Sequence, residues 1–414
     1  MKLLKQIRKF FNLSVTDKKA WNPLLWNLRG SQSVSGETVT EETALTYSAV
    51  FNAVALYSGT ISTLPLHLFR KDGKNKILAD DMPLFWVLYL KANPYMTALA
   101  LRETMMAHVL LWGNAYAEIV RDRMGQIVEL WPIAPNRVKP EMENSKLVYR
   151  IRVDSEEITL PREKILHIPG LGFDGFVGYS VVAMARKSLG LGMALETFGS
   201  KYFGTGMHPS AILTHPGQLK DPKSFREAVS TVYGGLGNAQ QLMVLEDGMK
   251  FEQISIPVED SQFLESRQFQ IPEIARWFNL PPHKLKDLTK SSFNNIESEQ
   301  ISFVTDSVLP WLVRFEQNYN IQLLYTNQRK AENLYFKHNV EGLLRGNAES
   351  RGNFYKALFN VGAISINEIR SKEDMDPIDG GDEYFVPLNM VPLSKLDDYM
   401  ALQEQKGTKT TEGK

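Results

Sequence analysis

The stretch Val258–Tyr325 constrains the fold more than any other, because it requires two helices joined by a polar, basic loop. The first helix begins after Pro257 and is ended by the pair Pro281–Pro282. Pro272 lies inside it and lacks an amide donor, so it predicts an interruption of this helix. The loop that follows spans residues 281–293 and leads into a second, longer helix.

The longer helix carries an apolar stripe with helical periodicity. Asn294 can cap its first turn, and Glu297 stands three residues further on, as in a capping box. Apolar residues then recur three or four positions apart: Ile296, Phe303, Val304, Val308, Trp311, Leu312, Phe315, Tyr319 and Leu323. Pro310 lies within this stripe and frees the carbonyl of Asp306, so we expect a kink rather than an end.

The composition limits the classes of function. The 414 residues predict roughly two or three domains. Lys+Arg and Asp+Glu both number 47, whereas a protein that grips DNA through its phosphates is expected to be basic. The neutral balance argues against such a protein, unless its basic groups are concentrated in one place. The absence of cysteine excludes disulfides and cysteine metal sites.

Residues 1–43 are predicted to form an N-terminal arm. Met1–Leu13 places basic and apolar residues at helical spacing but has no uninterrupted apolar core like that of a signal peptide. A partly ordered arm fits this pattern, as does an amphipathic helix that docks on a partner or on lipid. Residues 43–66 are uncharged, yet they carry one apolar stripe, which indicates a helix against a core rather than a membrane span. The stripe is Val50, Val54, Tyr57, Ile61 and Leu64.

A mixed α/β domain is predicted from residue 44 to residue 178. Helices are expected over Pro83–Ala92 and Thr97–Trp112, and strands in "NAYAEIVRD", "QIVELWPIAP", "LVYRIRV" and "KILHIPG". Their alternation suits half-exposed antiparallel strands. The long helix Tyr179–Phe203 follows and contains three glycines, each costing about 1 kcal/mol. Close approach of a neighbouring helix would explain Gly190, Gly192 and Gly199, and a broken helix is the alternative.

Residues 207–257 are predicted to form a compact β-α-β-β unit. Its helix has Asp221 as N-cap and Pro222 at the first position, and its hairpin turns at Asp247–Gly248. Downstream, "NLYFKHNV" predicts a strand that returns to the α/β domain.

The C-terminal part is predicted to be helical. Helices are expected over Asn347–Asn360 and Ser365–Arg370, joined at Gly362, and residues 394–414 are expected to be disordered.

No motif for catalysis, metal or cofactor binding is convincing. Gly170–Gly175 matches G-x-G-x-x-G, but no second parallel strand ending in an acid follows, because Glu196 falls inside a helix. A glycine-rich connection is the favoured interpretation, and a nucleotide site is the alternative. The histidines form no ligand pair of metal-site spacing. An acidic cluster lacks EF-hand spacing and predicts a glycine-rich turn: Asp374, Asp376, Asp379, Asp382 and Glu383.

Several blocks, taken in order, resemble the portal proteins of tailed bacteriophages. They are "GYSVVAMARKSLGLGMALETFGSKYFGTGMHPSAIL", "YGGLGNAQQLMVLEDGMKFEQIS", "EIARWFNLPPHKL", "SSFNNIESEQISFVTDSVLPWLVRFEQNYNIQLL" and "GLLRGNAESRGNFYKALFNVGAISINEIRS". The resemblance implies an α+β portal fold with these parts: wing 44–178, first stem helix 179–206, β-α-β-β clip 207–257, second stem helix 258–280, channel loop 281–293, long kinked helix with the return strand of the wing 294–342, and helical crown 343–393.

The resemblance also implies a function without catalysis or cofactor. Portal proteins form a ring, usually of about twelve copies, at one capsid vertex of the virion, after assembly in the host cytoplasm. The implied partners are double-stranded DNA of any sequence, the major capsid or scaffold protein, the terminase large subunit and a head–tail connector, with no membrane. A nucleotide-dependent enzyme built on Gly170–Gly175 is the alternative function.

The residues predicted to face DNA are His283, Lys284, Lys286 and Lys290, offset only by Asp287. In a ring of twelve, three lysines and one aspartate from each copy would make a collar of about +24 formal charge. Such a collar would touch phosphates and carry no sequence information. Outside a ring the same charges would be only a solvated loop.

Overall fold

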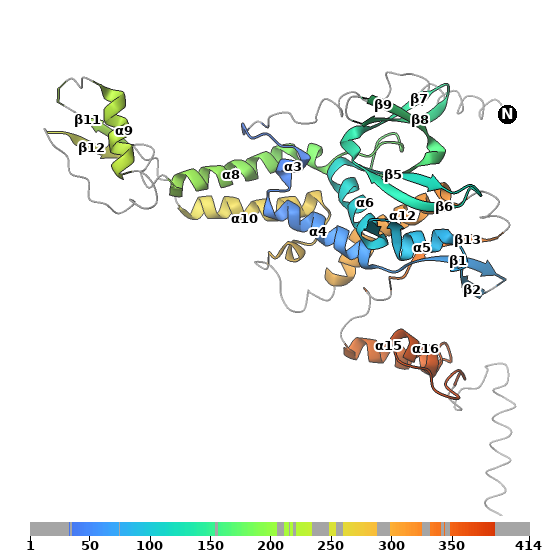
Figure 1. Cartoon of the computed structure of the whole chain (residues 1–414). Coiled ribbons are helices and arrows are strands. Elements are labelled where there is room, and N and C mark those ends of the chain that lie inside the picture. Colours follow the sequence, from blue (N-terminus) through green and yellow to red (C-terminus); the bar gives the residue numbers. More distant parts are fainter. Residues whose placement is uncertain are drawn as a thin grey trace, which may run out of the picture. The chain divides into compact units, whose positions relative to one another are not determined.

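The computed structural model describes residues 33–385 except for 34, 74, 154–155, 205–210, 215, 218–220, 234–247, 254–259, 288–298, 325–331, 341–342 and 344–347. The chain divides into two compact units, Met1–Val340 and Glu341–Lys414. The first combines helices with antiparallel sheets, so the predicted α+β class is confirmed (Figure 1). Most of the predicted N-terminal arm and the whole predicted C-terminal tail lie outside the described residues.

The first helices form close to where periodicity predicted them. Helix α3 (Glu41–Ala44) precedes α4 (Ser48–Thr63), which buries the predicted apolar stripe. Helix α6 (Ala98–Trp112) starts where the Thr97 hydroxyl accepts the amide of Ala100 at 3.1 Å. In the part of the chain that the structure describes, no helix is both long and apolar enough to span a membrane.

One predicted helix end is wrong. Helix α5 (Pro83–Tyr89) stops before Ala92, because strand β3 (Lys91–Asn93) pairs with β4 (Met96–Thr97). The competing strand pairing therefore overrides a local pattern that would have allowed another helical turn.

Three antiparallel sheets of three strands make up most of the β structure among the described residues, in the orders β13-β1-β2, β10-β5-β6 and β7-β8-β9. Their strands are β1 (Leu66–Asp72), β2 (Asn75–Leu78), β5 (Asn114–Arg121), β6 (Ile127–Ile133), β7 (Val138–Glu143), β8 (Lys146–Val153), β9 (Glu156–Pro161), β10 (Ile165–Pro169) and β13 (Leu334–His338). The late strand β13 pairs with β1, as predicted. The first half of β5 is buried on both faces, so the prediction of half-exposed strands holds only for its second half.

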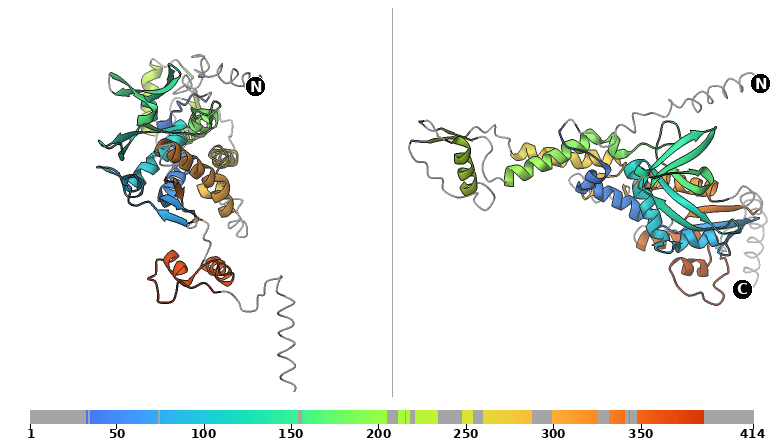
Figure 2. Two further views of the ribbon diagram at one scale, coloured as in Figure 1. Left: turned by 90° about the vertical axis from the view of Figure 1, so that its right-hand side faces the viewer. Right: turned by 45° about the horizontal axis from the view of Figure 1, so that its top comes forward.

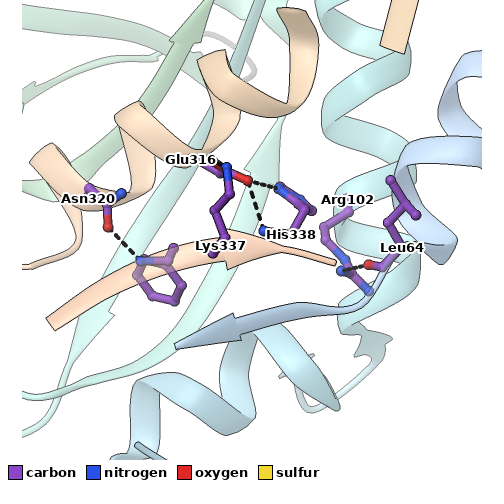
Figure 3. A network of polar contacts seen from close by, with 7 residues as sticks. Leu64, Arg102, Glu316, Asn320, Lys337 and His338 are labelled. Carbon is purple, nitrogen blue, oxygen red and sulfur yellow. Dashed lines mark hydrogen bonds and ion pairs between the residues drawn. The ribbon is translucent and has the colours of Figure 1, made fainter. Parts of the chain in front are cut away.

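Helix α12 (Leu309–Gln322) completes the outer edge of β13 with polar side chains (Figure 3). The Glu316 carboxylate accepts the amide of His338 at 2.8 Å, and the Asn320 side-chain oxygen accepts the amide of Phe336 at 2.7 Å. Because β13 is a terminal strand, these amides would otherwise lack a strand partner. Side chains of a helix thus take the place of a fourth strand.

Side chains of α12 also form hydrogen bonds with the backbone of β10, the terminal strand of a second sheet. The Gln322 side chain accepts the amide of His167 at 2.8 Å and donates to its carbonyl at 2.7 Å. The Arg314 guanidinium donates to the carbonyls of Pro169 and Gly170 at 2.9 and 2.6 Å. Helix α12 therefore clamps the edges of two sheets, and we call these contacts together with those of Glu316 and Asn320 the α12 clamp.

The predicted helix Tyr179–Phe203 is divided at Ala185 into α7 (Val181–Met184) and α8 (Arg186–Gly204). Within α8 the helix continues through its glycines. A β-carbon on Gly190 would clash with Ser33, and one on Gly192 would press on the ring of Tyr47. Within one chain, the close neighbour of these two glycines is therefore the N-terminal segment and not a helix, and the approach of a helix from another copy stays a prediction.

Helices α8 and α10 (Asp260–Trp277) lie side by side (Figure 2), and Arg267 pairs with Glu196 between them at 3.5 Å. The predicted interruption at Pro272 is wrong, because α10 is continuous through it. Proline leaves the carbonyl four residues earlier without a donor. That residue, Gln268, is exposed, so water can solvate the carbonyl and the helix persists.

Between these helices in sequence lie β11 (Ala211–Thr214), α9 (Pro222–Tyr233) and β12 (Lys250–Gln253), with β11 and β12 paired antiparallel. The predicted N-cap is confirmed, since the Asp221 carboxylate accepts the amides of Lys223 and Ser224 at 3.1 and 3.2 Å. The first strand of the predicted hairpin lies outside the described residues.

The second unit contains α15 (Ala348–Asn360) and α16 (Ile366–Lys372), joined at Gly362 with φ +66°. The acidic cluster forms the predicted glycine-rich turn. Buried Asn367 holds it by donating to the carbonyl of Ile378 and to the carboxylate of Asp382, both at 3.0 Å. Among the described residues, no group of three or more acidic or histidine side chains could hold a metal ion.

Candidate nucleic-acid interface

The root of the predicted channel loop is fixed where α10 ends. Asn279 turns the chain with φ +53°, and the amide of Leu280 donates to the carbonyl of Ala275 at 2.8 Å. The hydroxyl of Tyr57 donates to the carbonyls of Phe278 and Asn279 at 2.8 and 3.1 Å. Burial raises the pKa of Tyr57, so its hydroxyl stays protonated and remains a donor.

The far side of the loop returns to this root through a π-helical segment, Phe303–Val308, just before Pro310. A π-helical segment thus lies directly before Pro310, where a kink was predicted, and the bend itself stays a prediction. The carbonyl of Asp306, which the proline frees, accepts the side-chain amide of Asn279 at 2.9 Å. In return the hydroxyl of Ser307 donates to the carbonyl of Asn279 at 2.6 Å. Two segments that flank the loop are therefore tied to one another.

The first residues of the loop are structured. Pro282–Leu285 forms a 3-10 turn, and Leu285 is buried beneath it. The amide of Lys286 donates to the carbonyl of His283 at 3.0 Å, and Lys286 itself takes a left-handed conformation with φ +66°. A lysine in that region is uncommon, which marks a turn held by its surroundings.

Two of the four side chains predicted to face DNA have partners inside the chain. Lys284 donates to the side chain of Gln300, and its ammonium lies 4.8 Å from the ring centroid of Phe303. Burial, assisted by the charge of Lys286, lowers the pKa of Lys284. His283 pairs with Glu299, and its side chain is only 10% exposed. Gln300 and Glu299 thus hold the loop against the helix that follows it.

The remaining two predicted residues differ from these. Lys286 is exposed, and Lys290 lies outside the described residues. Sequence reasoning missed Tyr57 and Asn279, which hold the root. For Asn279 a signal existed, since asparagine tolerates the left-handed conformation and here precedes Leu280 and two prolines.

The geometry of Gly170–Gly175 does not fit a dinucleotide loop. Strand β10, which precedes it, pairs antiparallel with β5, whereas a dinucleotide loop follows a strand of a parallel sheet. Within the loop the Asp174 carboxylate accepts the amides of Phe176 and Val177 at 2.8 and 2.9 Å. These amides are occupied by a residue of the chain, so the loop is a tight connection, as favoured above.

Comparison with known proteins gives the same answer from the sequence and from the fold. The family model described as "Phage portal protein" matches residues 48–374. A "Probable portal protein" of Streptomyces phage phiC31 is 36% identical over 399 residues, with 90% of this chain and 85% of the relative covered. The "Portal protein" of Enterobacteria phage HK97 is 32% identical over 366 residues, covering 87% and 86%.

Solved structures show a shared fold at lower identity. A crystal structure of an HK97 family phage portal protein from Corynebacterium diphtheriae aligns with a TM-score of 0.53 at 17% identity, covering 76% of this chain and 98% of that one. The neck of a native gene transfer agent particle, computed with C12 symmetry, aligns with a TM-score of 0.55 at 18% identity, covering 86% and 98%. Phage portal proteins are structural proteins, so the alternative of a nucleotide-dependent enzyme is not supported. From this agreement of family model, relatives and fold, the chain belongs to the phage portal protein family.

Proposed function

We propose that the chain assembles into a closed ring of about twelve copies at one capsid vertex, through which double-stranded DNA passes during packaging and ejection. Two relatives named as portal proteins and the C12 symmetry of a structural neighbour support this proposal. The ring would assemble in the host cytoplasm and meet the major capsid or scaffold protein, the terminase large subunit and a head–tail connector. Force for DNA movement would come from the terminase, since portal proteins are not enzymes.

The elements are assigned to this ring by their order along the chain. The three sheets with α4, α5, α6 and the returning strand β13 make the wing. Helices α8 and α10 make the stem, and β11, α9 and β12 make the clip that meets terminase and connector. Helices α15 and α16 make the crown. The contact between α8 and α10 supports their assignment to one stem.

The fixed root of the loop is the observation that carries its assignment as the channel lining. The bond from Asn279 to the carbonyl of Asp306 holds both flanks together, so the loop leaves every copy at the same place. Because Lys284 is engaged with Phe303, the charges that face DNA are those of Lys286 and Lys290, offset by Asp287. The collar is then about +12 in a ring of twelve, and it acts within a Debye length of about 8 Å.

Two measurements test the ring and the loop separately. Electron microscopy of the purified protein should show annular particles, and monomers under all conditions would contradict the ring. The double variant Lys286→Ser, Lys290→Ser should form rings but package or retain DNA less well, with a defect relative to the parent that is largest at low salt and shrinks as salt screens the collar. Lys146→Ser, at an exposed lysine of β8, is the matched control. Parental packaging by the double variant at every ionic strength would refute the loop assignment and leave the ring standing.

A further inference from the structure

The outer face of the β13-β1-β2 sheet carries aromatic and lysine side chains. Leu66, Leu68 and Phe336 are buried on its core side. Side chains alternate along strands, and directly opposed residues share a face, so the register places a second set on the outer side. That set is His67, Phe69 and Lys71 of β1, Lys76 and Leu78 of β2, and Tyr335 and Lys337 of β13.

The rings on this face continue into α5 as one track. Centroids are 5.7 Å apart from Tyr335 to Phe69, 5.7 Å from Phe69 to His67, 6.0 Å from His67 to Tyr89, and 6.0 Å from Tyr89 to Trp86. Trp86 and Tyr89 are each 47% exposed. We call this track and the outer lysines the aromatic face. An exposed group of large aromatic side chains is typical of the centre of a protein interface.

Lys337 of the aromatic face pairs with Glu316 of α12 at 2.8 Å, and the other two outer lysines add charge of one sign. Lys71 and Lys76 stand directly opposite each other, and both are exposed. Like charges in that position are destabilising. None of the outward residues of the three strands is acidic, and among the described residues neither lysine forms an ion pair. The face is therefore complementary to a partner that brings carboxylates.

In the part of the chain that the structure describes, the sheet also has an open edge beside these lysines. Strand β2 is terminal in its sheet, and all four of its residues are exposed, including Ile77 at 46% and Leu78 at 41%. A free strand edge is a template for pairing with another chain, and strand addition is a recurrent mode of peptide recognition.

The geometry of the aromatic side chains favours a protein segment over a nucleic acid strand as the ligand of this face. Nucleobases bind aromatic side chains through open ring faces. Here Tyr89 is stacked on Phe85 at an interplanar angle of 21° and on His67 at 28°. The ring of Tyr89 is thus stacked on its neighbours within the track, which suits contact with apolar side chains of a protein better than stacking of a base.

We propose that β2 and the aromatic face bind an extended segment of another protein, which adds as a strand to β2 and carries both acidic and apolar side chains on the side that it turns toward the aromatic face, at every second residue. Its backbone would pair with the free edge of β2. Its carboxylates would meet Lys71 and Lys76, and its apolar side chains would cover the rings from Phe69 to Trp86. The proposal does not use the ring or the channel loop as a premise.

Fluorescence anisotropy with the full chain and three labelled probes tests the proposal. The first probe is a peptide about ten residues long, so that it spans β2, in which every second residue is threonine and the residues between them are alternately glutamate and valine, so that one face carries both glutamate and valine. The second replaces glutamate by lysine, and the third is single-stranded oligothymidine of similar length. We expect the acidic peptide to bind at least about tenfold more tightly than the basic one. The double variant Lys71→Glu, Lys76→Glu should reverse this preference, and Lys146→Glu should leave it unchanged.

Three results would overturn the proposal. One is no binding of the acidic peptide, and another is equal binding by the parent and the Lys71→Glu, Lys76→Glu variant. Tighter binding of oligothymidine through the same lysines would assign the face to nucleic acid instead. Hydrogen exchange adds a readout specific to strand addition, since the amides of β2 should exchange more slowly when the acidic peptide is bound. Methylation of alternate peptide nitrogens on the pairing side should abolish both effects.

Discussion

Two clusters in the first unit are built from the same residue types and differ in what surrounds them. In the α12 clamp, Glu316 is 9% exposed, and it pairs with fully buried His338 and with a lysine of β13. At the loop root Glu299 is 35% exposed and pairs with His283, beside Lys284. The first carboxylate also accepts a strand amide, so it completes a sheet. The second holds only a turn, and solvent screens it.

Of the variants that test this difference, Glu316→Ala should lower the unfolding free energy most. Its removal leaves the amide and ring of buried His338 without their acceptor. Breaking a buried, hydrogen-bonded pair costs about 3 kcal/mol of unfolding free energy. Urea denaturation should show the loss as a lower midpoint. The corresponding change at the loop root, Glu299→Ala, should cost less than about 1 kcal/mol. Equal losses in the two variants would show that burial does not separate the clusters.

Variants of Asn279 test how the loop root itself is stabilised. Asn279→Ala should cost about 2 kcal/mol, because alanine is strained at φ +53° and the bond to the carbonyl of Asp306 is lost. Asn279→Gly keeps the backbone conformation and loses only the bond, so about 1 kcal/mol is expected. Thermal unfolding of both variants separates the two contributions. If glycine and alanine are equally destabilising, the left-handed turn contributes nothing.

Sequence patterns predicted the elements better than the contacts between them. Helix α4 and strand β13 follow from local periodicity, and Asp221 from local capping preference. The α12 clamp could not be predicted, because Gln322 and His167 are far apart in sequence and polar residues of a helix are usually solvated. For the same reason Lys284 was interpreted as a loop charge, since nothing local shows that it rests on a ring.

Acid should destabilise the fold through the buried imidazole of His167, whose backbone is held by the α12 clamp. Burial, with a smaller contribution from Arg162, lowers its pKa to about 3. Below the unfolded value of about 6.5, the unfolded chain binds a proton that the folded chain does not. The contribution of neutral His167 to the unfolding free energy is therefore complete above that pH. It is lost as the pH falls, by about 1 kcal/mol between pH 7.5 and 5.5. Urea midpoints across this range should show the loss. His167→Gln should remove that part of the pH dependence.

The smallest effect is expected at Lys284, and it tests how the loop root uses a lysine. The ammonium lies over Phe303, and burial lowers the pKa of Lys284, so keeping the charge there is costly. The aliphatic stem, in contrast, covers apolar surface. Lys284→Met keeps the stem and adds a sulfur that packs well on a ring, so it should change the unfolding free energy by less than about 0.5 kcal/mol. Lys284→Ala removes the packing and should cost about 1 kcal/mol. If methionine costs as much as alanine, the charge rather than the stem holds the turn. Lys286→Met, at the exposed neighbour, should leave stability unchanged in either case.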